Sequence, residues 1–418
     1  YFLAVAVMIP VAGFLGDKFG TKRIFLVALS GFVAASALSG TAQSLQQLVA
    51  FCMIQGLFAG LITPIGSAML FRAFPLPERA KASAAVISVA VIAPAVGPTL
   101  GGLLIETLSW RWIFYINIPI GGLGLVVAAL WLHEEVVGAS GRIDWVGLIM
   151  SGGGLGLVLF GVSEGPNRGW GSPLVLASLV VGIVAIVVLI VVETRIENPA
   201  LALRLFRDRL FRSANLVSAP LYMGFFGGIF LLPIFLQTVG GHPPLTTGLT
   251  VSAQALGVML TSQLAGRRLY NTVGPRRLLL VGSLAAMVAG LWFVTIDETT
   301  ALPAIAVATF TRGLAMGLVF IPIQTATYAT IPLRDMGRAT SLFNMQRQAA
   351  VATGIALVAT VLSSSVSSLA NPAEGGAPTA DRVNAFQSAF LVSALAFGVA
   401  AALSLLVHDE DAQATMRT

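Results

Sequence analysis

Long apolar stretches, separated by short polar turns, run along nearly the whole chain. Each is about 20 residues long, which is the length that an α-helix needs to cross about 30 Å of lipid hydrocarbon. The pattern predicts an all-α polytopic membrane protein. Its thirteen predicted spans cover residues 1–16, 24–40, 47–70, 83–104, 112–132, 145–162, 173–192, 213–238, 248–266, 278–296, 301–329, 341–362 and 386–407.

The charged residues lie almost entirely in the turns, and only 10% of all residues are charged. Most of the 24 basic residues fall in alternate turns, and therefore on one side of the membrane. This asymmetry is the positive-inside pattern, so we expect that side and the C-terminus to be cytosolic. The formal charge of +6 thus reflects membrane topology and predicts no nucleic-acid partner. We expect a multi-pass protein of the inner or plasma membrane, with the lipid bilayer as its surroundings.

An internal repeat relates the two ends of the chain. The stretch MIQGLFAGLITPI at 53–65 resembles FTRGLAMGLVFIPI at 310–323, and FPLPERAKAS at 74–83 resembles IPLRDMGRAT at 331–340 at the same offset. Repeats in one orientation predict two bundle halves related by an axis along the membrane normal. We therefore predict an N-terminal half at 1–132, two additional linker spans with their loops at 133–200, and a C-terminal half with a cytosolic tail at 201–418.

Counting spans within this repeat gives six in the second half and five in the first. The expectation is therefore a protein of fourteen spans, of which this chain holds thirteen and lacks the first. The acidic ending HDEDAQATMRT is predicted to be disordered.

The first turn, GFLGDKFGTKR, combines spaced glycines, an acid and basic residues between two apolar runs. Glycines let two helix ends approach closely, and a carboxylate can meet a basic side chain or a helix N-terminus of another span. A solvated turn is the alternative reading. The stretch resembles the cytosolic signature loop of the major facilitator superfamily, which implies a conformational latch formed by Gly13, Asp17, Gly20, Lys22 and Arg23.

A second motif, APAVGPTLGG at 93–102, places prolines and glycines inside a predicted membrane helix, where they permit kinks and close helix contacts. It resembles the antiporter signature of drug:proton antiporters, through Pro94, Gly97, Pro98, Gly101 and Gly102. The following SWRWIFYINIPIG at 109–121 is similar to the fourteen-span branch of the EmrB and QacA type. The resemblance implies the major facilitator fold, with small-molecule substrates and protons as partners. It leaves accessory periplasmic or outer-membrane partners open.

Polar residues inside the predicted spans are candidates for a central cavity or for bonds between helices. Two arginines, Arg312 and Arg347, fall within spans, and Arg312 lies deep, where a charge costs about 3 kcal/mol unless it is paired or hydrated. Cys52 stands where the resemblance would place an arginine, which puts proton coupling through that position in question. The candidates for the cavity are Gln55, Gln254, Arg312, Gln324, Asn344 and Gln348.

Catalytic and cofactor chemistry is not indicated. The three histidines are scattered in loops, which predicts no metal site, and the chain has no phosphate-binding GxxxxGK[ST] stretch. We therefore expect no enzyme activity and no cofactor. The sequence favours a secondary exporter of small hydrophobic or cationic compounds, in multidrug efflux and antibiotic resistance. A dedicated exporter of one metabolite, antibiotic or siderophore, and a transport-dead membrane sensor or scaffold, are the alternatives.

Overall fold

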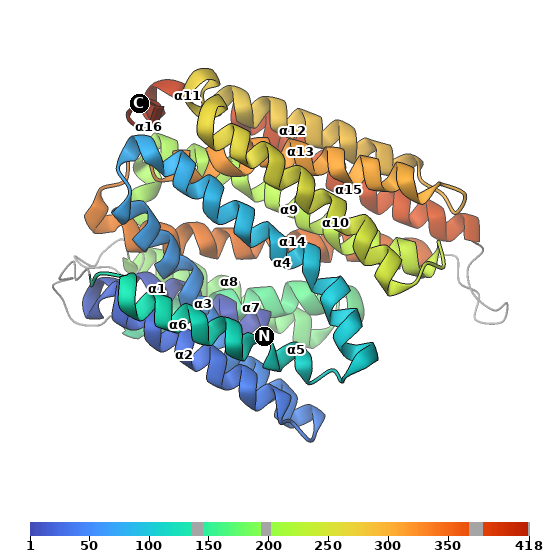
Figure 1. The fold of residues 1–418 in the computed structure, drawn as a ribbon, viewed down its shortest axis with the longest axis horizontal. Helices are drawn as coiled ribbons and strands as arrows, with labels where there is room; N and C mark the ends of the chain where they lie inside the picture. The colour runs from blue at the N-terminus through green and yellow to red at the C-terminus, as the bar shows by residue number, and fades with distance from the viewer. Residues whose placement is uncertain (135–144, 194–201, 368–378, 417–418) are drawn as a thin grey trace.

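The computed structural model describes residues 1–134, 145–193, 202–367 and 379–416, in which every regular element is a helix (Figure 1). The longer helices are α1 (Phe2–Phe19), α2 (Thr21–Gly40), α3 (Leu45–Ala73), α4 (Arg79–Thr107), α6 (Asn117–Trp131), α7 (Trp145–Arg168), α8 (Pro173–Glu193), α9 (Arg209–Thr238), α10 (Pro244–Leu264), α12 (Pro275–Trp292), α13 (Leu302–Thr327), α14 (Met336–Ser367) and α15 (Thr379–Ser404). The short α-helices are α5 (Trp112–Tyr115), α11 (Tyr270–Val273) and α16 (Gln413–Met416). Single turns form η1 (Leu76–Glu78), η2 (Leu203–Arg207), η3 (Ala265–Leu269), η4 (Phe293–Thr295), η5 (Leu333–Asp335) and η6 (Asp409–Ala412).

Eleven helical segments of the described part are long and apolar enough to cross a membrane, with α5 and α6 counting as one segment. The expected spans at 83–104 and 248–266 are helical as well, as α4 and α10, but are not among these eleven. Along α10, Thr, Ser and Gln side chains interrupt the apolar residues and lower its mean hydropathy. The all-helical membrane architecture predicted from the sequence is confirmed.

The helices form two groups, which we call the N-terminal helices (α1–α6) and the C-terminal helices (α9–α15). In Figure 1 the blue and teal helices lie on one side and the yellow and red ones on the other, with α4 and α14 between them. The groups meet where α1 and α3 pack on α14 and where α4 packs on α10. The hairpin of α7 and α8 packs against α1 and α14.

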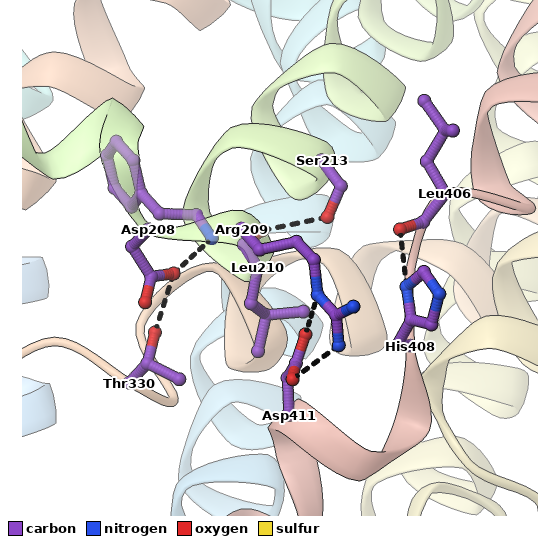
Figure 2. Close-up of polar contacts among 9 residues, drawn as sticks. Asp208, Arg209, Leu210, Ser213, Thr330, Leu406, His408 and Asp411 are labelled. Carbon is purple, nitrogen blue, oxygen red and sulfur yellow. Dashed lines mark hydrogen bonds and ion pairs between the residues drawn. The ribbon is translucent and has the colours of Figure 1, made fainter.

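Local sequence explains where several helices begin. The Ser44 hydroxyl accepts a hydrogen bond of 3.3 Å from the backbone N–H of Gln47, and so caps α3. The Asp208 carboxylate caps α9 in the same way, accepting from the N–H of Phe211 at 2.8 Å (Figure 2). A proline inside a helix, such as Pro64 of α3, is tolerated in membrane helices because neighbouring helices and side chains compensate the lost hydrogen bond.

The largest buried apolar cluster joins both groups at one end of the bundle. Ala68 and Phe71 of α3 belong to the same cluster as Tyr328 and Phe343 from the C-terminal helices. The rings of Phe71 and Tyr328 lie 4.6 Å apart. This end also carries the basic turns at 18–23, 72–81, 267–277 and 334–338, and we call it the basic end.

The acidic ending of the chain is ordered through residue 416, so the expectation of disorder is wrong. Residues 409–416 form η6 and α16 beside α11 and the start of α12 (Figure 1). The hydroxyls of Tyr270 and Thr415 share a buried hydrogen bond of 2.8 Å. Two carboxylates of the ending, Asp409 and Asp411, also have partners in the C-terminal helices. These contacts hold the ending in one conformation, although its polar composition alone predicts disorder.

Candidate functional site

The two groups of helices are joined at the basic end by a set of polar contacts that we call the seam (Gly13, Asp17, Arg72, Leu333, Gly337 and Ser341). The Ser341 hydroxyl accepts a hydrogen bond of 2.8 Å from the backbone N–H of Gly13. Gly13 and Gly337 are so close that a Cβ atom on Gly13 would collide with the carbonyl oxygen of Gly337. Only glycine at position 13 therefore allows α1 and α14 to touch in this way.

Asp17 and Arg72 form the ion pair of the seam. The Arg72 Nη2 atom donates to Asp17 Oδ1 at 2.6 Å, and the side chains of Arg72 and Asp17 are 4% and 3% exposed respectively. The Arg72 Nε atom also donates to the backbone oxygen of Leu333, at 3.3 Å. A Cβ atom on Gly337 would lie 2.6 Å from Asp17 Oδ1, so the carboxylate sits at the first turn of α14, where the helix dipole favours a negative charge. Arg72 thus connects an N-terminal helix to the turn that precedes α14.

A third contact closes the basic end beside the seam. The Arg79 guanidinium donates to the backbone oxygen of Tyr328 at 3.0 Å. Nearby, a Cβ atom on Gly266 would lie 2.5 Å from the Cβ of Ala84, so α4 and η3 are in tight contact. Further along α4 the packing changes: a Cβ atom on Gly97 or Gly101 would meet no described atom within 4 Å. The close contact between α4 and η3 therefore lies at the basic end, whereas Gly97 and Gly101 have open space beside them.

The remaining residues of the first predicted motif lie away from the seam. Gly20 has φ +99°, a conformation that favours glycine, and separates α1 from α2. The backbone N–H groups of Lys22 and Arg23 donate to the two carboxylate oxygens of Glu134, both at 3.2 Å. Glu134 follows α6, so this carboxylate connects the end of α6 to the start of α2.

The C-terminal helices repeat this arrangement. Gly274 has φ +87° and precedes α12, and the N–H of Arg276 donates to the Asp409 carboxylate at 2.8 Å. Asp409 follows α15 as Glu134 follows α6. We call Glu134 and Asp409 the paired caps. Each is preceded by a histidine and followed by a glutamate, in LHEE at 132–135 and VHDE at 407–410, a repeat that was not recognised from the sequence.

Asp411 anchors the ending of the chain to α9. Its two oxygens accept from Nε and Nη2 of Arg209, both at 2.8 Å (Figure 2). This paired bond lowers the pKa of the Asp411 carboxyl below its usual value. A lowered pKa means that the bond contributes fully above the usual Asp value of about 3.9 and is lost only as the pH falls through the lower value.

We therefore expect the ending to stay docked at pH 7 and at pH 5, and to detach only below about pH 4. A fluorophore on Gln413→Cys, an exposed position, reports detachment as a fall in anisotropy in a Cys52→Ser background. Asp411→Asn is expected to lower the anisotropy already at pH 7, whereas the exposed Glu410→Gln is not. Equal anisotropy in both variants would contradict a role of the Arg209 bond in docking.

The structure brings together two of the candidate cavity residues. The Arg312 Nη2 atom donates to Gln254 Oε1 at 2.6 Å, and the guanidinium lies 4.9 Å from the ring centre of Phe293. Arg312 is 1% exposed, and its Nε atom has no partner in the described part of the chain. Arg312 therefore contacts neighbouring C-terminal helices in this conformation.

The other candidates lie apart from this pair. Gln55 is buried in α3, and the Asn344 amide donates to the backbone oxygen of Thr340 in its own helix. Gln324 and Gln348 are half-buried, and the Cys52 sulfur lies 3.9 Å from the Ser39 hydroxyl. The stretch at 93–102, which resembles the antiporter signature, lies on α4. Of its residues, the surroundings of Pro94, Pro98 and Gly102 fall outside the described part.

Comparison with known proteins gives a consistent result. Residues 1–355 match the family model of the Major Facilitator Superfamily. The chain is 33% identical over 367 residues to the multidrug resistance protein B homolog of Mycobacterium tuberculosis, covering 87% of this chain and 68% of that protein. It is 32% identical to the multidrug export protein EmrB of Haemophilus influenzae, over 85% of this chain and 70% of that protein. Its identity to the puromycin resistance protein of Streptomyces alboniger is 33%, over 86% of this chain and 72% of that protein.

The fold is also that of a solved transporter. The structure of the human organic anion transporter MFSD10 (TETRAN) superposes with a TM-score of 0.68 at 16% identity, covering 96% of this chain and 81% of that chain. At this identity the likeness concerns the fold alone. The family match extends over most of the chain and includes the seam and the glycines that precede α2 and α12. The chain is a multi-pass, non-enzymatic membrane transporter that belongs to the Major Facilitator Superfamily.

Proposed function

We propose that the protein is a secondary exporter that releases small hydrophobic or cationic compounds from the cell by alternating access. The observation that carries this proposal is the closure of the basic end by the seam and by the adjoining contact of Arg79 with Tyr328. With the basic end cytosolic, as its charges indicate, this conformation is closed to the cytosol. Opening the seam would give the second conformation that transport requires.

Multidrug efflux is supported by the relatives, which are named for resistance to several drugs or to puromycin. We propose exchange for protons because the stretch at 93–102 resembles the signature of drug:proton antiporters. In this proposal residues 1–132 and 201–418 move against each other as two halves, and the two spans within 133–200 accompany them. The fourteen-span EmrB and QacA type is the branch that these extra spans favour.

The test is transport by the full-length protein in proteoliposomes that contain a pH-sensitive dye. With a proton gradient imposed, we expect a compound from a panel that includes ethidium and puromycin to dissipate the gradient and to accumulate. Uptake without proton movement would overturn the coupling to protons. Absence of both transport and proton movement across the panel would overturn the exporter function.

Arg72→Gln is expected to reduce transport about tenfold or more in this assay, because it leaves the buried Asp17 carboxylate without its charged partner. Arg334→Gln is the matched control: this arginine is also at the basic end, but its side chain is 77% exposed. Similar rates in both variants would show that closure does not depend on the Asp17–Arg72 pair.

A further inference from the structure

Arg347 is a second arginine inside a membrane span, and its surroundings differ from those of Arg312. It lies about 16 Å along α14 from the first residue of that helix, at 1.5 Å per residue. The segment Leu333–Ser364 that contains it is one of the apolar spans. A charge at this depth is costly and is retained in membrane proteins where it faces a partner, a cavity or a substrate path.

No carboxylate neutralises Arg347 within the described part of the chain. The ion pairs found there, all within 4 Å, involve other arginines, and Arg72 of the seam has Asp17. Arg347 instead lies beside the ring of Tyr222 on α9, whose centre is 5.9 Å from the guanidinium carbon. Arg347 is only half-buried, and its guanidinium carries five N–H donors.

Aromatic rings from three helices gather around Tyr222, the ring next to Arg347. Tyr222 stacks with Phe320 of α13 at 5.8 Å and with Phe226 of α9 at 6.3 Å, with interplanar angles of 25° and 29°. Phe343, one turn before Arg347 on α14, meets the edge of Tyr222 at 6.3 Å. Phe226 is half-buried, whereas Tyr222 and Phe320 are buried. The half-buried members of the cluster are therefore Phe226 and Arg347, each of which lies next to Tyr222.

The cluster lies directly inside the closed basic end. Phe343 also contacts Tyr328 at 5.8 Å, and Tyr328 contacts Phe71 of the N-terminal helices. A compound that enters from the opposite end would reach Phe226 and Arg347 before it reached this contact between the groups. On the other side of α14, Met345 and Ala349 pack against α7, so Arg347 does not face that hairpin.

We propose that Arg347, Tyr222 and Phe226 form a substrate subsite that binds the anionic group of an aromatic amphiphile, such as a carboxylate or sulfonate. This rests on the proposed transport function and concerns the hydrophobic compounds in its substrate range, specifically aromatic ones that also carry an anionic group. The guanidinium pairs with the anion, and the aromatic rings accept the apolar body of the compound. The sign of the charge is opposite to that of the hydrophobic cations predicted from the resemblance.

Binding of matched probes to the full-length protein in nanodiscs, measured by calorimetry, tests the subsite. The probes are naphthalene-2-sulfonate and 2-naphthyltrimethylammonium, which share one ring system and carry opposite permanent charges. We expect wild type to bind the sulfonate about tenfold more tightly or better, since hydrogen bonds to a charged group are worth about that factor. Arg347→Gln should abolish this preference, and Arg347→Lys should retain part of it.

Controls separate the subsite from folding and from transport. Tyr222→Leu is expected to weaken binding of both probes, because it removes aromatic contact and leaves the charge in place. Arg382→Gln, at an arginine in the first turn of α15 at the opposite end, should change binding of neither probe. Equal affinity of wild type for the two probes, preference for the cation, or binding of neither probe would overturn the subsite. Sulfonate preference without transport of any compound would leave the subsite standing and overturn the proposed function instead.

Discussion

Gly13→Val is expected to reduce transport by about ten- to a hundredfold while leaving the protein folded. The added side chain would collide with the backbone of Gly337. Its Cβ atom alone would lie only 2.7 Å from the Ser341 hydroxyl oxygen. Overpacking of this kind costs about 1–3 kcal/mol, and here the cost falls only on the conformation in which the basic end is closed. The population of that conformation decreases accordingly.

Gly16→Ala is the matched control, one turn further along α1. A Cβ atom there would lie 3.5 Å from the nearest side chain, an ordinary contact distance. Spin labels on Arg23→Cys and Arg334→Cys, whose native side chains are 78% and 77% exposed, report the separation of the groups in a Cys52→Ser background. We expect longer distances in Gly13→Val than in Gly16→Ala. Indistinguishable distances and rates would contradict closure through the Gly13–Gly337 contact.

Gln254→Leu is expected to destabilise the protein by about 2–3 kcal/mol. The substitution removes the side-chain acceptor of Arg312, and the charged guanidinium would remain buried with one partner fewer. A thermal unfolding series in detergent measures the effect. Gln324→Leu, at a half-buried glutamine of α13, should change the unfolding temperature much less.

The double variant Arg312→Met/Gln254→Leu decides what this pair does. Replacing both partners of a buried polar pair by apolar residues is often neutral, so we expect the double variant to regain most of the lost stability. Because Arg312 is 1% exposed, we also expect the double variant to transport. Restored stability without transport would instead assign Arg312 to the substrate cavity.

The periodic features of the chain can be predicted from its sequence. Apolar runs of membrane length indicate the helices, because a lipid-exposed backbone has few alternatives. The helices α4 and α10 are among those expected. The mean hydropathy of α10 is lowered by polar side chains that bond to the backbone of its own turns, as Thr250 does to Thr246. The prediction for the tail is wrong because its acidic composition indicates solvation, whereas its partners, Arg209 and Arg276, lie far away in the sequence.

The site can be predicted only in part. The glycines and the acid of the first motif form a local pattern, which indicates that Asp17 needs a basic side chain or a helix N-terminus. The partner Arg72 lies 55 residues away and Ser341 is separated from Gly13 by 328, distances over which no periodicity connects them. Glu134 was missed although its repeat with Asp409 is present in the sequence. Arg347 is recognisable as a charge within a span, but its aromatic neighbours come from two other helices.

The paired caps join helices within each group and so bear on how each group would move in the proposed opening. Glu134 ties α6 to α2, and Asp409 ties α15 to α12, and these helices also pack along each other. The last helix of each group is thereby bonded to an earlier helix of the same group at the basic end. In the proposed exporter we therefore expect α15 and α12 to move together, because the Asp409 bond and their packing join them. If each group moves as one body in this way, the proposed opening would have to break mainly the contacts of the seam.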